Sequence, residues 1–150
     1  MKAHLLRYLV AAVVLAGCAA TGPEFQPVAA QADKATVYIY RPDLTLWMGG
    51  YPYVSVGAEK KFALLNNGYR VMTLPPGKHS IRFQGTTFGT NWPAPPVSHN
   101  VDLQAGQEYF IRAHPELLDK NRPLVGRTRV ELVAREEALR ELASVRLITD

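Results

Sequence analysis

Two segments of this chain alternate strictly between apolar and polar side chains, and this period of two restricts the fold more than any other feature. In residues 78–84, His79, Ile81 and Phe83 fall on one face. Residues 97–103 repeat the pattern with Val97, His99, Val101 and Leu103. A strand with one packed face and one solvated face is typical of an antiparallel sheet. The alternation therefore predicts antiparallel β-structure here.

Short runs rich in β-branched and aromatic residues occur on both sides of these segments, and turn residues end each run. They cover residues 37–40, 51–56, 61–65, 69–74, 108–113 and 127–133, the last with Thr128, Val130 and Leu132 inward. The stretches Asn66-Asn67-Gly68 and Pro75-Pro76-Gly77 separate neighbouring runs and predict tight hairpins. About eight short strands indicate an all-β fold, an antiparallel β-sandwich rather than a squat barrel.

The hydrophobic period changes near the C-terminus. Residues 135–143 place Ala138, Leu139, Leu142 and Ala143 on one stripe, which predicts a short amphipathic helix. We expect this helix to cover an open end or edge of the sheet. Strands and helix together form one predicted domain, residues 35–150, because a chain of this length supports a single core.

The first 17 residues have the layout of a secretory signal peptide: a basic start with Lys2 and Arg7, an apolar run of about ten residues and small residues at the exit. The run is shorter than the roughly 20 residues of a membrane-spanning helix. Leu15-Ala16-Gly17-Cys18 resembles the bacterial lipobox, in which the cysteine becomes the first mature residue. The resemblance implies that Cys18 carries a diacylglyceryl group and an N-linked acyl chain.

The lipobox resemblance also implies a location, because Ala19 rather than an aspartate follows the cysteine. It implies sorting to the outer membrane, with the domain at the periplasmic face. Residues 18–34 are small and polar and contain Pro23 and Pro27, so we expect a flexible tether after the lipidated cysteine. Cys18 is the one cysteine of the chain, so stability must come from the hydrophobic core without a disulfide.

The charge of the expected mature chain is nearly balanced. The full chain has 17 Lys and Arg and 13 Asp and Glu. Lys2 and Arg7 are lost with the leader, so 15 basic residues remain against 13 acidic ones and the net charge is +2. Nucleic-acid-binding domains concentrate basic residues on one face. The scattered, near-balanced charge therefore argues against a nucleic-acid partner.

Several motifs in order resemble an uncharacterised family of Gram-negative lipoproteins, domain of unknown function 2846. They are the opening Val37-Tyr38-Ile39-Tyr40-Arg41-Pro42, Val54-Ser55-Val56-Gly57, Leu74-Pro75-Pro76-Gly77-Lys78-His79 and Glu108-Tyr109-Phe110-Ile111-Arg112. The likeness covers most of residues 35–147. It implies an all-β fold and an envelope location, and it implies no activity, cofactor or site residue.

Motifs for catalysis are missing from the sequence. It contains no Gly-x-Ser-x-Gly, no His-Glu-x-x-His and no glycine-rich phosphate loop. We therefore expect neither an enzyme nor a cofactor. His79, His99 and His114 could hold a divalent metal ion if the fold brought them together, but rings satisfied by nearby backbone groups are the preferred interpretation.

Two loops carry the aromatic residues best suited to recognition. Residues 44–53 hold Trp47, Tyr51 and Tyr53 around Gly49-Gly50, and residues 85–96 hold Phe88, Asn91 and Trp92 among prolines. Aromatic side chains on loops of a rigid scaffold offer large contact areas at low entropic cost. The alternative is that the rings cap the open end of the sandwich.

The sequence as a whole predicts a lipid-anchored, periplasm-facing outer-membrane lipoprotein without enzymatic activity. Its expected role is that of an accessory or binding module for another envelope protein or a glycan. The alternative is a carrier of a small ligand or metal ion that uses the inward-facing histidines.

Overall fold

A computed structural model describes residues 19–57 and 61–149 of the 150-residue chain. The expected signal peptide, residues 1–17, and the expected lipidation at Cys18 lie outside the described residues. No helix within the described ranges is long and apolar enough to cross a membrane.

The described residues form nine strands and one helix. In chain order these are β1 (Ala35–Arg41), β2 (Tyr53–Val56), β3 (Phe62–Ala63), β4 (Gly68–Leu74), β5 (Gly77–Gln84), β6 (Val97–Leu103), β7 (Glu108–Leu117), β8 (Gly126–Leu132), α2 (Arg135–Leu142) and β9 (Arg146–Leu147). The all-β prediction with a short C-terminal helix is confirmed.

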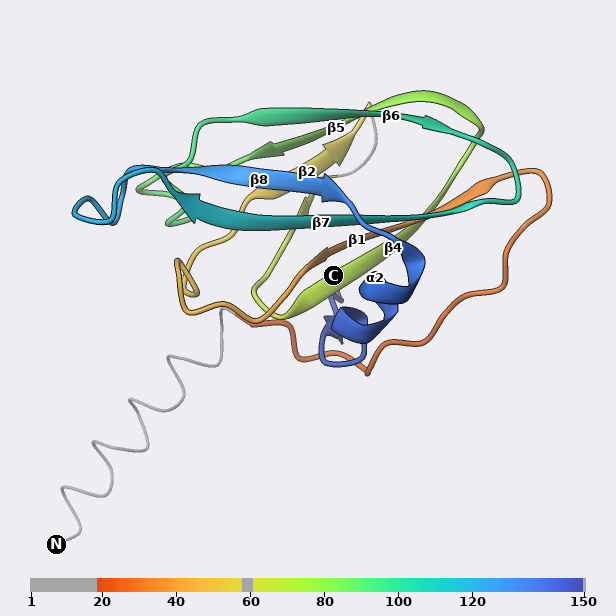
Figure 1. Cartoon of the computed structure of the whole chain (residues 1–150), viewed down its shortest axis with the longest axis horizontal. Coiled ribbons are helices and arrows are strands. Elements are labelled where there is room, and N and C mark those ends of the chain that lie inside the picture. The colour runs from red at the N-terminus through yellow and green to blue at the C-terminus, as the bar shows by residue number, and fades with distance from the viewer. Residues whose placement is uncertain (1–18, 58–60, 150) are drawn as a thin grey trace, which may run out of the picture.

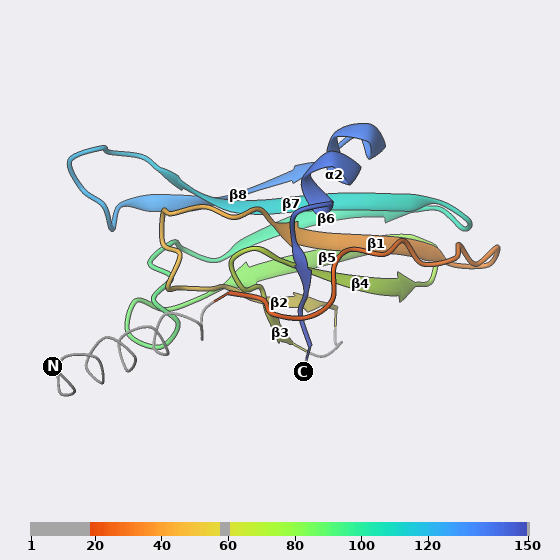
Figure 2. The same ribbon diagram turned by 90° about the horizontal axis from the view of Figure 1, so that it is seen from below.

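The strands form two packed sheets, seen edge-on in Figure 2. One sheet has the order β8-β7-β1-β4-β9 and the other the order β3-β2-β5-β6. Pairing is mostly antiparallel, but β7 runs parallel to β1 and β9 runs parallel to β4. The five-stranded sheet is therefore mixed. The parallel pair arises because the chain forms β5 and β6 in the other sheet before it returns beside β1.

Both turns expected to make hairpins instead carry the chain from one sheet to the other. The Asn66-Asn67-Gly68 turn leaves β3, which pairs with β2, and enters β4, which pairs with β1. The Pro75-Pro76-Gly77 turn returns the chain to β5 in the four-stranded sheet. Asn67 and Gly77 have φ values of 53° and 122°, so both turns have the backbone conformation that their sequences predict, but the strands that flank each turn do not pair with each other.

The main core lies between the two sheets. From β1 it takes Val37 and Ile39, and from β5 it takes Ile81 and Phe83, all four fully buried. Every residue of β1 is buried, because this strand has a neighbour on each side and is covered on both faces. The period-two pattern of the sequence located the inward residues of β5 and β6.

A second apolar cluster covers the outer face of the five-stranded sheet. The rings of Tyr38 and Phe110 stack there with centroids 5.0 Å apart, and Ala138 and Leu142 of α2 pack against them. The helix therefore lies on a sheet face, as Figure 1 shows, and the expectation that it would cover an open end or edge is wrong. Tyr38 and Tyr40 of β1 and Phe110 of β7 make this part of the outer face apolar, so it needs a cover more than the sheet edges do.

Residues 19–34, expected as a tether, lie along the domain for much of their length (Figure 1). Phe25 contacts the rings of Tyr38 and Tyr69, with centroids 5.5 and 5.3 Å away. The backbone N–H of Val28 donates to the Tyr38 hydroxyl at 3.0 Å. These contacts complete the second cluster, which explains why a segment with two prolines packs against the sheet.

Two strand details differ from the predictions. β7 continues through Pro115 to Leu117, whereas the run predicted from the sequence ends at residue 113. Proline is tolerated there because β1 pairs with β7 only as far as Arg112, so the Pro115 nitrogen needs no partner on that side. Leu132, predicted to point inward, is 55 % exposed at the end of β8, whereas Thr128 is buried.

Candidate functional site

Three loops meet at one end of the sandwich. Residues 42–52 follow β1, residues 85–96 follow β5 and residues 118–125 follow β7. The pairing registers place the C-terminal ends of these three strands at the same end of the molecule (Figure 2). We call this part the loop end, and it contains both aromatic loops that the sequence singled out.

Arg41 organises the loop end from inside. Its side chain is fully buried at the end of β1 and donates from Nη1 to the Gly50 carbonyl at 2.7 Å and from Nη2 to the Trp47 carbonyl at 2.9 Å. Its guanidinium also lies over the Trp92 ring, 4.8 Å from the centroid. Burial lowers the pKa of Arg41 to about 10. The sequence predicts only the end of a strand here, because no local pattern indicates that Arg41 is buried.

Two tryptophans close the loop end over the core. The Trp47 and Trp92 rings meet edge to face with centroids 5.2 Å apart. Trp92 is 1 % exposed and donates from Nε1 to Thr128 Oγ1 at 2.9 Å, whereas the Trp47 indole donates to the Pro123 carbonyl at 2.7 Å. Both rings therefore hold loops together, and Trp92 presents no surface to a ligand.

The loop of residues 85–96 has its own hydrogen-bonded scaffold. Thr90 Oγ1 accepts from the Thr86 N–H at 2.9 Å, and Thr86 Oγ1 accepts from the Gly89 N–H at 2.8 Å. Asn91, a candidate recognition residue, has φ 52° and is exposed. Phe88 stands at the tip of the loop and is 100 % exposed. This scaffold displays a large ring without any cover from the domain.

A groove of about 480 Å³ lies beside this loop. Tyr53 forms one wall, 39 % exposed, and its ring meets that of Tyr51 edge to face at 5.5 Å. The other lining residues are Gln84, Gly85, Thr86, Gly89, Thr90 and Pro96. This lining supplies hydroxyl, amide and aromatic groups but no carboxylate, imidazole or amine. It suits non-covalent binding and offers no acid–base pair for catalysis.

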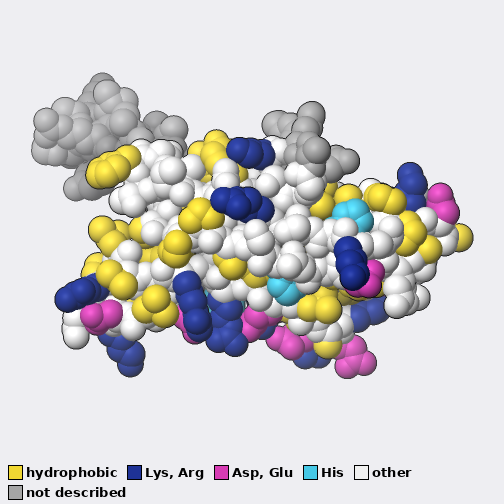
Figure 3. Space-filling model, turned by 90° about the horizontal axis from the view of Figure 1, so that it is seen from above, with side chains coloured by type: hydrophobic (Ala, Val, Ile, Leu, Met, Phe, Trp, Pro, Cys, Tyr) yellow, Lys and Arg dark blue, Asp and Glu magenta, His cyan; other side chains and the backbone are white. Residues whose placement is uncertain are grey.

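Exposed apolar side chains gather at the loop end. Of the eight large hydrophobic residues exposed in the described part of the chain, six lie there: Met48, Tyr53, Phe88, Leu118, Leu124 and Val125. Hydrophobic groups are visible over the left-hand end in Figure 3. The loop of residues 118–125 was not among the predicted recognition loops, although the Leu117-Leu118 and Leu124-Val125 pairs on either side of a polar turn are a signal for it.

The structure does not bring the three histidines together. His79 and His99 lie on neighbouring strands of the four-stranded sheet, on the face that carries Ile81 and Phe83. His114 lies on β7 beside Arg112 and Glu131, on the outer face of the other sheet, where burial lowers its pKa. His79 Nε2 lies 2.8 Å from the Pro75 carbonyl. Across residues 19–57 and 61–149, no three His, Cys, Asp or Glu residues form a group able to hold a metal ion.

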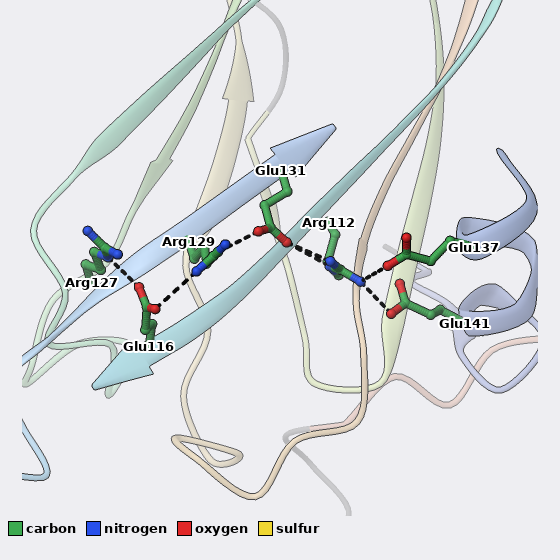
Figure 4. Close-up of polar contacts among 7 residues, drawn as sticks. All are labelled: Arg112, Glu116, Arg127, Arg129, Glu131, Glu137 and Glu141. Atoms are coloured by element: carbon green, nitrogen blue, oxygen red, sulfur yellow. Dashed lines mark hydrogen bonds and ion pairs between the residues drawn. The ribbon is translucent and has the colours of Figure 1, made fainter. Parts of the chain in front are cut away.

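A charged network crosses the outer face of β7 and β8 and reaches α2 (Figure 4). Arg112 donates to Glu131 at 2.7 Å, to Glu137 at 2.9 Å and to Glu141 at 2.6 Å. Burial alone would lower the pKa of Arg112, but its hydrogen bonds to these three carboxylates raise it. Glu141 also accepts from the Tyr40 hydroxyl. The network ties the helix to the sheet.

The same network continues along the strands with alternating charge. Glu131 accepts from Arg129, and Glu116 accepts from both Arg129 and Arg127. Arg112 is the first cause of the lowered pKa of Glu131, and Arg127 is the first cause for Glu116. All these carboxylates are matched by guanidinium groups on the sheet surface, so the network is a structural element rather than a site with a spare acid or base.

Comparison with known protein families identifies the family of this chain. A family model described as protein of unknown function (DUF2846) matches residues 31–125, more than half of the 150 residues, and the chain belongs to this family. The match runs from the residues before β1 to the end of the loop between β7 and β8, so β8, α2 and β9 lie beyond it. No curated relative matches the chain.

Proposed function

We propose that this DUF2846 chain is a lipid-anchored lipoprotein of the outer membrane that faces the periplasm and serves as a non-enzymatic accessory or binding module. The observation that carries the proposal is the order of features at the N-terminus. A basic start, a short apolar run and small residues lead directly to Cys18 in Leu15-Ala16-Gly17-Cys18. Several acyl chains on one cysteine hold a protein at a membrane far more firmly than a single chain does.

The surface chemistry of the domain supports a binding role. The groove beside Tyr53 offers an aromatic wall and neutral polar groups, and the charged residues of the outer face pair with one another. Such a surface is suited to binding a partner through packing contacts and hydrogen bonds, and not to cleaving a bond in it. The partner class is an envelope component, a protein or a glycan.

The test of the anchor is Cys18→Ala in the full chain, made in a Gram-negative host that is fed a labelled fatty acid. The wild-type chain incorporates label, loses its leader and fractionates with the outer membrane. The Cys18→Ala chain incorporates no label and leaves the membrane fraction or keeps its leader. Equal labelling of the two chains would refute the proposal. Ala19→Ser is the matched control, since it changes a neighbouring residue and keeps the thiol.

A further inference from the structure

The first described residues hold the start of the chain at the loop end. Ala19 forms a β-bridge with Asn66, and the Ala20 N–H donates to the Asn66 carbonyl at 3.0 Å. Ala20 is only 6 % exposed, so this attachment is part of the packed domain. Asn66 precedes β4 at the end where β1 finishes, because Arg41 pairs with Gly68. The chain therefore joins the domain at the loop end.

This attachment restricts where an anchor on Cys18 can sit. Consecutive Cα atoms are about 3.8 Å apart, so acyl chains on Cys18 start one residue away from a docked segment. A long flexible tether would have allowed the domain any orientation. With residues 19 and 20 bonded to Asn66, the loop end is the part of the domain nearest the membrane that holds the anchor.

The loop end has the surface that a bilayer favours. Phe88 is 100 % exposed in the loop of residues 85–96, and Leu118 and Leu124 are 61 % and 62 % exposed in the loop of residues 118–125. Met48, in the third loop, is 48 % exposed. Apolar side chains displayed in this way gain stability when they enter the headgroup and acyl boundary. Lys120 and Arg122 lie in the same loop as Leu118 and Leu124 and are exposed.

The acidic residues at this end are already partnered. Asp43 accepts from Asn66 Nδ2 at 2.7 Å, and Asp119 pairs with Arg122 at 3.5 Å. Carboxylates without partners would oppose an approach to anionic headgroups, and these two do so less. The loops are also held rigid from behind by Arg41, Trp47 and Trp92. The exposed rings and aliphatic groups are thus presented together, as a fixed surface.

From these observations we propose that the loop end docks on the phospholipid surface of the membrane that carries the anchor, with Phe88 and Leu124 entering the bilayer interface. The inference rests on the proposed lipidation of Cys18 and names the surface that the loop end meets. The orientation leaves the opposite end of the sandwich, with the Pro75-Pro76-Gly77 turn and the turn between β6 and β7, facing away from the membrane.

The experiment uses the full chain, processed and purified from a Gram-negative host, in vesicles of phosphatidylethanolamine and phosphatidylglycerol. Phe88→Trp places a fluorescent ring on the proposed docking surface. Gln107→Trp is the matched control, because Gln107 is also exposed but lies in the turn between β6 and β7, at the opposite end. Both variants keep Trp47 and Trp92, so each is compared with the wild-type chain in vesicles with and without brominated acyl chains.

We expect the emission added by Phe88→Trp to shift to the blue in vesicles and to be lost with brominated lipid, and the emission added by Gln107→Trp to do neither. If the purified chain carries acyl groups and binds vesicles but Phe88→Trp is not quenched, the docking proposal is wrong and the loop end is open to a protein or glycan. Equal quenching of the two variants also overturns it. If mass spectrometry finds no acyl groups, the proposed anchor itself fails, and docking fails with it.

Discussion

The guanidinium of Arg41 lies 4.8 Å from the centre of the Trp92 ring, although the two residues are 51 positions apart in the sequence. The contact joins the end of β1, in the five-stranded sheet, to the loop between β5 and β6, in the four-stranded sheet. Arg41 also holds the Trp47 and Gly50 carbonyls of a second loop. One buried cation therefore fixes the relative positions of the two aromatic loops.

Replacing Arg41 should destabilise the whole loop end. Arg41→Ala leaves the buried Gly50 carbonyl without its donor and removes one of the two donors to the Trp47 carbonyl. A buried group left unpaired costs roughly 1–3 kcal/mol. We expect a loss of about 2–4 kcal/mol in the free energy of unfolding, measured by urea denaturation. Arg41→Lys should recover little, because one ammonium replaces a planar fork that donates from two nitrogens. Arg82→Ala, an exposed arginine on β5, is the control and should change stability by less than about 0.5 kcal/mol.

The two large aromatic residues of the loop of residues 85–96 should respond oppositely to truncation. Trp92→Ala removes a buried ring and the partner of Thr128, and should cost about 3–5 kcal/mol. Phe88→Ala removes a ring that touches only solvent, so unfolding should change by less than about 0.5 kcal/mol. Thermal melts of both variants by circular dichroism check this. A Phe88→Ala chain as unstable as Trp92→Ala would contradict the exposed position of Phe88.

The contrast between these two residues shows what the sequence could and could not predict. Both are large aromatic residues in one loop, and nothing in the local pattern separates a ring that caps the core from one that is displayed. The difference arises from tertiary partners, Arg41 and Thr128, which approach from distant strands. Strand positions and the helix were predictable because alternation and turn residues act locally.

The pairing of strands was less predictable for a related reason. The Asn67 turn has the backbone conformation that its sequence predicts, but its flanking strands enter different sheets. The parallel pairing of β1 with β7 likewise depends on the path of the chain between these two strands, which crosses to the other sheet and back. The histidines illustrate the same limit. The alternating pattern predicts which face of the sheet carries His79 and His99, but it cannot predict that His114 lies on the outer face of the other sheet.

The Arg112 network should make stability depend on pH in the acid range. Arg112 lowers the pKa of Glu131 relative to the unfolded chain, so the carboxylate stabilises the fold above about pH 4.5. This contribution is lost as the pH falls through the lowered pKa. Arg112→Met should therefore lower the free energy of unfolding by about 1–2 kcal/mol at pH 7 and by much less at pH 3. The value at pH 7 is modest because solvent screens the pair with Glu137, which is 48 % exposed.

Urea unfolding of both chains at the two pH values measures the effect. Arg122→Met is the matched control, since Arg122 is 73 % exposed in its pair with Asp119 and should contribute little at either pH. A penalty for Arg112→Met that is as large at pH 3 as at pH 7 would show that the side chain acts by packing alone and that its ion pairs contribute nothing.

The packing of residues 19–34 on the domain can be tested through Gly22. A Cβ at this position would lie 2.2 Å from the Leu147 carbonyl oxygen, a backbone atom that cannot move aside cheaply. Gly22→Ala should therefore displace the segment from β9 and weaken the Phe25 contacts with Tyr38 and Tyr69. Overpacking of this kind costs typically 1–3 kcal/mol, here confined to the segment and the strand it covers.

Limited proteolysis should cut residues 19–34 faster in Gly22→Ala than in the wild type. Gly49→Ala is the control, because nothing lies within 4 Å of its Cβ. Equal protection of all three chains would mean that the segment does not lie against Leu147 in solution.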